Sequence, residues 1–256
     1  MATVIVANDL VGVGKVALTS SLPIMSACQT EVLPLPTVLL SSHTGEFENI
    51  YMRDLTDDLK GFYKQWEHLD FTVDGLVSGY FKSREELKIV GQLARDKRIA
   101  LFVDPIMGDN GRLYQGFDME YVEAMKDFCQ QADAIIPNLT EASLLTDSPY
   151  LEVGSYDKAT VDKLLRDLTK LGPRKVVLTG ISFEEGKIGL AYFDKETNKT
   201  TYLMRKSYKS HFYGSGDLVT AILASGYFHH LNLLKVANLA LDFMDQVLSS
   251  TLASGR

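Results

Sequence analysis

The chain has 256 residues, of which 46% are hydrophobic and 23% are charged, and its formal net charge is −7. This composition is that of an ordinary globular protein, and the length suits a single α/β domain over residues 1–256 better than two small domains. The net negative charge argues against a general nucleic-acid binder, because such proteins usually present a basic face.

Strands rich in valine and isoleucine are predicted to alternate with amphipathic helices along most of the chain. The expected strands are Thr3–Ala7, Val32–Leu40, Gly75–Ser78, Ile99–Val103, Ala134–Ile136 and Val176–Thr179. The expected helices are Lys15–Cys28, Leu55–His68, Arg84–Asp96, Met119–Gln130 and Lys158–Leu171. Strands that are apolar on both faces are typical of a parallel sheet covered by helices on each side. The pattern therefore predicts a three-layer α/β/α fold with a mostly parallel central sheet.

The pattern changes in the last quarter of the chain. Ile188–Phe193 and Thr200–Arg205 flank a polar stretch, which predicts an antiparallel hairpin at the edge of the sheet. Two further helices are expected at Asp217–Phe228 and Leu233–Ser250. Because we find no internal repeat and no linker rich in proline or serine, we expect one domain.

Neither a secretory leader nor a membrane span is expected. The first apolar run, Thr3–Ala7, is followed directly by polar residues, and no apolar stretch approaches the length of about 18 residues that a span needs. Cys28 and Cys129 are too few for a disulfide framework and lie in helix-like apolar patterns, so buried free thiols are expected. These features together predict a cytoplasmic protein without a membrane partner.

Polar or glycine-containing motifs follow the predicted strands. Ligands of doubly wound sheets bind beyond the carboxyl ends of the strands, so these motifs are expected to form a site together. They are Asn8-Asp9, Ser42-His43-Thr44-Gly45, Gly79-Tyr80, Asp104-Pro105, Asn138 and Thr179-Gly180.

Residues 12–17 (GVGKVA) satisfy the G-x-G-x-x-A pattern of dinucleotide-binding proteins. However, Ser41 and Ser42 stand at the end of the second strand, where an acidic residue would be needed to hold a ribose, and Glu31 lies at the beginning of that strand instead. Several residues also separate the first strand from Gly12. The segment is not a phosphate-binding P-loop either, because Val16 stands where a Ser or Thr would bind Mg²⁺. NAD-dependent oxidoreduction remains an alternative that depends on this motif alone.

Residues 213–217 (YGSGD) open the apolar helix expected near the C-terminus. Gly214 and Gly216 allow close approach of the backbone to a ligand, and the helix N-terminus directs free N–H groups at it, so an anion is the expected occupant. A purely structural role is also open, in which Ser215 caps the helix and Asp217 is a favourable charge in its first turn. An aspartate at this position is expected to have a lowered pKa.

Five segments resemble known kinase motifs. The turn at residues 214–217 resembles the G-[TS]-G-D signature of the ribokinase superfamily, and residues 137–142 (PNLTEA) resemble its P-N-x-x-E-A segment. Residues 104–109 (DPIMGD), 41–45 (SSHTG) and 77–80 (VSGY) resemble D-P-V-[ML]-G-D, S-[NT]-H-T-G and [LT]-[ST]-G-Y of the pyridoxal kinases. Because order and spacing agree from about residue 3 to residue 253, the chain resembles a pyridoxal kinase over nearly its whole length.

The resemblance implies a ribokinase-like enzyme that transfers the γ-phosphate of ATP to the 5′-hydroxymethyl group of a vitamin B6 vitamer: pyridoxal, pyridoxamine or pyridoxine. It implies that Asp217 activates the acceptor while Gly214, Ser215 and Gly216 hold the transferred phosphoryl group. It also implies Mg²⁺, bound with the help of Asp104 and Glu141, and a homodimer.

The resemblance further implies which residues contact the two substrates. Residues expected beside the nucleotide are Asp104, Asn138, Thr179, Gly180, Gly214 and Ser215. Residues expected beside the vitamer are Asn8, Asp9, His43, Thr44 and Tyr80. Lys206–Phe212 is the expected adenine-side loop, and segments 43–51 and 107–116 are candidates for a closing loop.

The chain departs from the pyridoxal kinases after the first strand, where they carry a serine that binds the pyridine ring. Asn8 or Asp9 is expected to replace it, and an aspartate could pair with a protonated ring nitrogen. The same segment resembles the D-x-S-G-G-A-G start of the pyrimidine kinases of thiamine synthesis, without its serine and doubled glycine. A hydroxymethylpyrimidine kinase is therefore one alternative, and a non-catalytic vitamer-binding protein on the same fold is another.

Overall fold

A central sheet of nine strands forms the middle layer of the computed structural model, which describes residues 1–45, 47–69, 71–210 and 212–254. The order of its strands is β11-β10-β9-β8-β5-β4-β1-β2-β3. The strands are β1 (Ala2–Val13), β2 (Thr30–Ser42), β3 (Met52–Asp54), β4 (Gly75–Ser78), β5 (Ala100–Val103), β8 (Ala134–Ile135), β9 (Lys175–Ile181), β10 (Lys187–Asp194) and β11 (Lys199–Lys206). Strands β1, β2, β4, β5, β8 and β9 are parallel, whereas β3 at one edge and the β10–β11 hairpin at the other are antiparallel.

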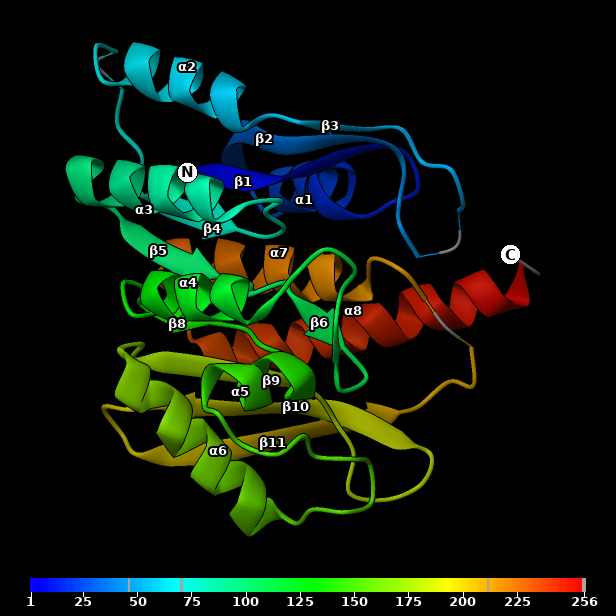
Figure 1. The fold of residues 1–256 in the computed structure, drawn as a ribbon. Helices are drawn as coiled ribbons and strands as arrows, with labels where there is room; N and C mark the ends of the chain where they lie inside the picture. Colours follow the sequence, from blue (N-terminus) through cyan, green and yellow to red (C-terminus); the bar gives the residue numbers. More distant parts are fainter. Residues whose placement is uncertain (46, 70, 211, 255–256) are drawn as a thin grey trace.

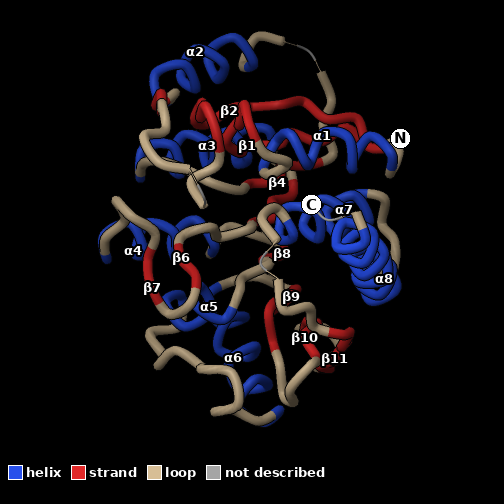
Figure 2. The backbone as a smooth tube through the Cα atoms, turned by 90° about the vertical axis from the view of Figure 1, so that its right-hand side faces the viewer, coloured by secondary structure: helices blue, strands red, loops and turns tan. Residues whose placement is uncertain are grey.

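Helices cover both faces of this sheet (Figures 1 and 2). The helices on one face are α2 (Thr56–Trp66), α3 (Arg84–Lys97), α4 (Met119–Cys129), α5 (Leu139–Leu145) and α6 (Lys158–Leu171). The opposite face carries α1 (Ala17–Ala27), α7 (Ser215–Phe228) and α8 (Leu233–Ala253). A separate small hairpin is formed by β6 (Gly108–Asp109) and β7 (Arg112–Leu113). The predicted three-layer α/β/α architecture and its antiparallel edge hairpin are confirmed.

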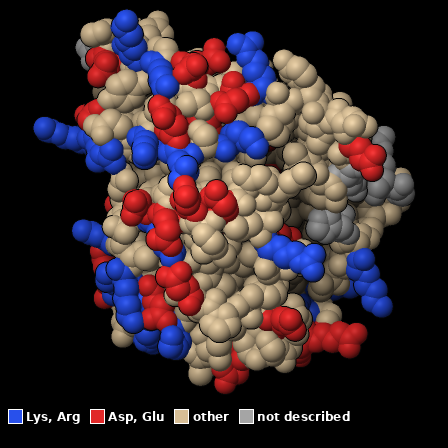
Figure 3. Space-filling view, viewed as in Figure 1, with Lys and Arg blue, Asp and Glu red and all other residues tan. Residues whose placement is uncertain are grey.

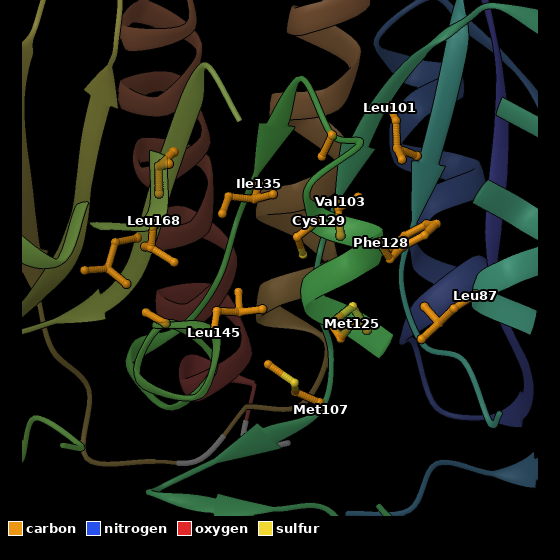
Figure 4. Close-up of a cluster of buried hydrophobic side chains, with 14 of the residues drawn as sticks. Leu87, Leu101, Val103, Met107, Met125, Phe128, Cys129, Ile135, Leu145 and Leu168 are labelled. Atoms are coloured by element: carbon orange, nitrogen blue, oxygen red, sulfur yellow. The ribbon is translucent and has the colours of Figure 1, made fainter. Parts of the chain in front are cut away.

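The core on the α2–α6 side is built from the strands and the helices that cross them. Figure 4 shows Val103 of β5 and Ile135 of β8 among side chains from α4, including Met125 and Phe128. All four side chains are buried. This packing holds the strands in register and so brings their carboxyl ends to one edge of the sheet.

Strands β1 and β2 run well beyond the expected Thr3–Ala7 and Val32–Leu40. They pair with each other as far as Val13 and Ser42, so the polar residues after Ala7 stay in extended backbone and do not begin a loop. An irregularity lies between Asn8 and Leu10, where β1 advances two residues while β2 advances from Pro36 to Leu39. Such a β-bulge redirects side chains, and it occurs at the candidate site.

Three elements were not expected from the sequence: the short strand β3, the β6–β7 hairpin and the helix α5. Each is short, with two to seven residues, so hydrophobic periodicity is too brief to reveal it. Tertiary hydrogen bonds hold the hairpin, including one from Gly111 N–H to Thr140 Oγ1 (2.9 Å). The hairpin is therefore fixed by contacts with other parts of the chain.

No helix in the described part of the chain has both the length and the apolar character needed to cross a membrane. Both cysteines are free thiols, as expected, but only Cys129 is buried. Cys28 is half-buried because it lies at the C-terminal end of α1, where the helix stops. On the face seen in Figure 3, lysine and arginine side chains are interspersed with aspartate and glutamate.

Candidate functional site

Several of the segments that carry the predicted site residues lie side by side across the sheet. Gly79 N–H donates to Ala7 O (2.8 Å), which joins the end of β4 to β1, and Asp104 N–H donates to Ser78 O (3.0 Å), which joins β5 to β4. Farther along the edge, Asn138 and Thr179 form a parallel β-bridge. Ile136 N–H donates to Val103 O (2.9 Å) and joins the two parts, so the predicted site residues from the first strand to Thr179 lie in neighbouring segments.

Asp217 lies in the first turn of α7, close to residues from β1 and α1. Its carboxylate accepts hydrogen bonds from the backbone N–H of Ala17 and from the side chain of Asn8, and both bonds lower its pKa. Burial has the larger effect, so the pKa of Asp217 is raised above its ordinary value. The expectation of a lowered pKa is wrong, because desolvation of this carboxylate outweighs the helix N-terminus and the two donors.

The turn before Asp217 leaves the N-terminus of α7 without a side-chain cap. Gly214 has a left-handed backbone (φ 81°), and a Cβ there would lie 2.3 Å from Lys15 O, so only glycine fits. The alternative in which Ser215 caps the helix is not observed, because its hydroxyl donates to Phe212 O (3.2 Å). Gly216 is exposed, with no atom within 4 Å of the position of a Cβ. The first-turn N–H groups of α7 are therefore available to an anion.

Asp104 is joined to the same helix through Thr220, whose hydroxyl donates to Asp104 Oδ2 (2.7 Å). Burial raises the pKa of Asp104 to about 7, and the nearby charge of Asp217 adds to the effect. Sequence reasoning missed Thr220. Its spacing of three residues from Asp217 places it on the same face of α7, which is the signal that would have found it.

Glu141 and Asn138 form a capping box at the N-terminus of α5. Glu141 Oε2 accepts from Asn138 N–H (2.8 Å) and its Oε1 accepts from Met107 N–H (3.3 Å), while Asn138 Nδ2 donates to Gly108 O (2.9 Å). Burial, followed by the nearby Asp104, raises the pKa of Glu141 well above its ordinary value. This pair therefore stabilises the N-terminus of α5.

Metal binding by protein side chains alone is not indicated. Within the described ranges, no group of three or more His, Cys, Asp or Glu side chains is arranged to hold an ion. Asp104 Oδ2 accepts a hydrogen bond from the Thr220 hydroxyl, but no described residue donates a hydrogen bond to Asp104 Oδ1. One carboxylate oxygen is therefore left for an ion that brings other ligands with it.

Asn8 and Asp9, expected beside the vitamer, both lie next to Asp217. Asn8 Oδ1 accepts from the backbone N–H groups of Tyr80 (2.7 Å) and Asp9 (3.0 Å). The Asp9 side chain is buried, and burial together with the charge of Asp217 raises its pKa to about 7. Burial and the nearby Asp9 also raise the pKa of Tyr80 to about 12.

His43 is brought against the turn at residues 213–217 by Tyr213, to which the sequence assigned no role of its own. The two rings lie 4.7 Å apart between centroids, and the Tyr213 hydroxyl donates to Gly45 O (2.9 Å). Gly14 allows this approach, since a Cβ there would lie 2.6 Å from His43 Cδ2. Thr44 is exposed at the tip of the same loop. The loop after β2 therefore contacts the residue that precedes Gly214.

Thr179 and Gly180 lie inside β9 and not beyond its end. The pairing of β9 with β10 skips Gly180, which has a left-handed backbone (φ 75°) and open space beside its Cα. Thr179 N–H donates to Pro137 O (2.9 Å), so Thr179 keeps its backbone pairing. The unpaired residue of the bulge is Gly180. Two of the loop expectations are only partly described: His211 of the adenine-side loop and Glu46 of segment 43–51 lie outside the described residues.

Comparison with known proteins gives consistent matches. The sequence model of the phosphomethylpyrimidine kinase family matches residues 56–256. A curated pyridoxal kinase of Dictyostelium discoideum is 28% identical over 212 residues, which cover 75% of this chain and 67% of that enzyme. The chain thus spans about two thirds of the length of this curated relative.

Solved structures match over nearly the whole chain. Pyridoxal kinase from Lactobacillus plantarum superposes with a TM-score of 0.92 at 32% identity, covering 100% of this chain and 91% of that one. A Bacteroides thetaiotaomicron protein, provisionally assigned as a phosphomethylpyrimidine kinase and crystallised in an orthorhombic form with pyridoxal, gives a TM-score of 0.92 at 31% identity, covering 98% and 88%.

Proposed function

This chain belongs to the phosphomethylpyrimidine kinase family and, within the ribokinase superfamily, to the pyridoxal kinases, and on that premise we propose that it transfers the γ-phosphate of ATP to the 5′-hydroxymethyl group of a vitamin B6 vitamer. The observation that carries the proposal is the uncapped N-terminus of α7 with the Asp217 carboxylate in its first turn. This arrangement offers a base and an anion site to the same reacting group.

The reaction needs positioning and charge stabilisation more than covalent chemistry, because phosphoryl transfer passes through a loose transition state. The acceptor hydroxyl attacks the γ-phosphorus, its proton passes to Asp217, and ADP leaves. The raised pKa of Asp217 makes it a better base than an exposed aspartate. The N–H groups of Gly214, Ser215 and Gly216 hold the phosphoryl oxygens during the transfer.

Asp104, Asn138, Thr179 and Gly180 form the nucleotide side of the site in this proposal. The open backbone at Gly180 admits a phosphate closely, and the Asn138–Glu141 capping box fixes the end of β8 beside it. Mg²⁺ would neutralise charge on the phosphates. Asp104 Oδ1 suits it as a ligand, directly or through water, with Glu141 acting through water, since Mg²⁺ keeps much of its hydration.

The acceptor side consists of Asn8, Asp9, His43, Thr44 and Tyr80. Contacts between Tyr213 and the loop after β2 support closure of this loop over the acceptor. Closure excludes water, which would otherwise compete with the acceptor hydroxyl for the phosphoryl group.

Two alternatives remain testable. A hydroxymethylpyrimidine acceptor is favoured by one observation, the match to the phosphomethylpyrimidine kinase family model. A non-catalytic vitamer-binding protein would have no use for a carboxylate beside an uncapped helix N-terminus, and the intact turn at residues 214–217 argues against it.

The test is release of ADP from ATP and Mg²⁺ with pyridoxal, pyridoxamine, pyridoxine or the hydroxymethylpyrimidine as acceptor. We expect turnover with at least one B6 vitamer and a lower kcat/KM for the pyrimidine; the reverse order would select the pyrimidine kinase. Asp217→Asn should lower kcat by about 10²- to 10⁴-fold while ATP still binds. The exposed Asp127→Asn on α4 is the matched control and should keep wild-type activity. ADP release by no acceptor, or full activity of Asp217→Asn, would refute the proposal.

We also propose that the protein is a cytoplasmic homodimer. The two free thiols suit a reducing compartment. The sheet edge at β3 exposes apolar surface at Tyr51 and Met52, the kind of surface that a second subunit covers. Sedimentation of the purified protein tests the dimer, and a monomer at micromolar concentration would exclude it.

A further inference from the structure

The connection between β1 and α1, residues 14–17 (GKVA), lies against the turn that precedes Asp217. A Cβ on Gly214 would lie 2.3 Å from Lys15 O, so the backbone of Lys15 packs directly on the glycine turn. Two residues farther on, Ala17 N–H donates to the Asp217 carboxylate. The connection therefore contacts both parts of the phosphoryl-transfer site, the glycine turn and the base.

The backbone of this connection is held in one conformation. The Thr19 hydroxyl donates to Gly14 O (3.1 Å) and to Val16 O (2.7 Å). Gly14 and Ala17 both have left-handed backbones (φ 117° and φ 50°). For Ala17 this conformation is strained, and such strain persists where the surrounding structure enforces it. The side chain of Lys15 therefore starts from a fixed point beside the turn.

The ammonium group of Lys15 is available to a ligand. Lys15 is exposed, and its side chain makes no hydrogen bond or ion pair with any residue in the described ranges. The donors to the Asp217 carboxylate are Ala17 N–H and the Asn8 side chain, so the base does not use the charge of Lys15. A lysine carries three N–H donors on a long, flexible stem and is a common phosphate ligand in proteins.

The electrostatics of the site call for a cation. Beyond the effect of burial, the charge of Asp217 raises the pKa of Asp9 and of Asp104, and Asp104 likewise raises the pKa of Glu141. ATP brings further negative charge, which the transition state spreads over the oxygens of the transferred phosphoryl group. A cation fixed beside the turn offsets this repulsion and adds to the effect of the free N–H groups of α7.

We propose that Lys15 is a catalytic residue whose ammonium group binds the γ-phosphoryl oxygens as this group passes from ATP to the acceptor. The inference rests on the function proposed above. During the transfer a bond forms between the acceptor oxygen and the γ-phosphorus, the bond between this phosphorus and the ADP oxygen breaks, and the acceptor proton passes to Asp217. Lys15 keeps its protons, so its contribution is electrostatic. The Gly-Lys pair of segment 12–17 thus serves a phosphate without forming a P-loop or a dinucleotide site.

Lys15→Met tests the charge, because it keeps an unbranched side chain and removes the ammonium group. We expect kcat to fall by about 100-fold, the usual cost of losing one group that stabilises transition-state charge. Lys15→Arg keeps a cation and should recover most of the loss. Lys199→Met is the matched control and should keep wild-type kcat. Lys199 is exposed at the start of β11 and pairs with Asp194, at the opposite end of the sheet from the site.

Nucleotide binding separates a phosphate contact from a structural role. Calorimetric titration with Mg²⁺ compares ADP with the β,γ-methylene analogue of ATP, which alone carries a γ-phosphate. Lys15→Met should weaken binding of the analogue by about 10- to 100-fold, the size of a hydrogen bond to a charged group, and leave the affinity for ADP nearly unchanged. Its midpoint of urea denaturation should equal that of the wild type, since the side chain is exposed.

Several results would overturn the inference while leaving the kinase intact. They are a kcat of Lys15→Met within a few-fold of wild type, and an equal loss of affinity for ADP and for the analogue. Lys209, exposed in the loop before the turn, is the competing cation, so a loss in Lys209→Met with none in Lys15→Met would also overturn it.

The proposed function fails in a different way. Absence of turnover by the wild type with every acceptor overturns the kinase, and the comparison of the two nucleotides then still tests Lys15. Binding of the analogue that Lys15→Met leaves unchanged would refute the inference in that case. Wild-type protein that binds neither nucleotide would refute both.

Discussion

Replacing Asp9 by asparagine tests the claim that this carboxylate is buried without a partner of opposite charge in the free protein. Burial and the charge of Asp217 raise the pKa of Asp9 from 3.8 to about 7. Between pH 3.8 and about pH 7 the folded chain therefore keeps Asp9 protonated, whereas the unfolded chain has lost this proton. The resulting contribution to stability is complete below the unfolded pKa and is lost as the pH rises through the folded pKa.

The size of the effect follows from the shift. A rise from 3.8 to about 7 in the pKa of Asp9 corresponds to roughly 4 kcal/mol at high pH, of which roughly 2–3 kcal/mol should be lost between pH 5 and pH 8. Asp9→Asn cannot ionise, so its free energy of unfolding relative to wild type should increase by roughly 2–3 kcal/mol over the same interval.

Urea denaturation at pH 5 and pH 8, without nucleotide or vitamer, measures this difference. Asp127→Asn, on the exposed face of α4, controls for the loss of a negative charge and should differ from wild type equally at both values. If Asp9→Asn also differs from wild type equally at pH 5 and pH 8, Asp9 takes up no proton on folding. The account of a buried, unpaired carboxylate would then be wrong.

Two further substitutions test the positions of other groups in the site. Thr220→Val removes the donor to Asp104 Oδ2 and should cost about 1–3 kcal/mol of stability in denaturation, whereas Thr220→Ser should restore most of it; equal stability of both variants would contradict the hydrogen bond. Gly214→Ala places a Cβ against Lys15 O and should lower kcat by about 100-fold through displacement of the turn. Gly154 has a similar backbone (φ 84°) with open space around it, so Gly154→Ala introduces the backbone strain without a steric clash. Equal activity of Gly154→Ala and Gly214→Ala would contradict the clash with Lys15 O as the cause of the loss.

The sequence predicted the sheet, the main helices and the edge hairpin because these elements are long and strongly periodic. It failed where the backbone depends on partners far along the chain. The polar pair after Ala7 was expected to leave the first strand, yet β1 continues to Val13 because β2 pairs with it throughout. Gly12 of the dinucleotide-like motif therefore lies inside a strand, and a Cβ there would lie 2.7 Å from Ser41 O, which explains the glycine without any cofactor.

The candidate site shows the same division between local and distant effects. Glycine motifs and acidic residues at strand ends were visible from local patterns alone. The direction of the pKa shift at Asp217 was not, because it depends on how far tertiary contacts remove the carboxylate from water. Likewise, Thr220 and Tyr213 are ordinary residues of a helix and a loop until the fold places Asp104 and His43 against them.

The contacts of Asp217 also bear on how much of the chain makes a working enzyme. Both of its donors, Asn8 and Ala17, precede residue 56, where the match to the family model begins. A shortened chain that started there would contain the complete G-S-G-D signature, but its carboxylate would have neither donor. Finding the signature in a fragment therefore does not identify a kinase, because the chemistry of its aspartate is supplied by the opposite end of the polypeptide.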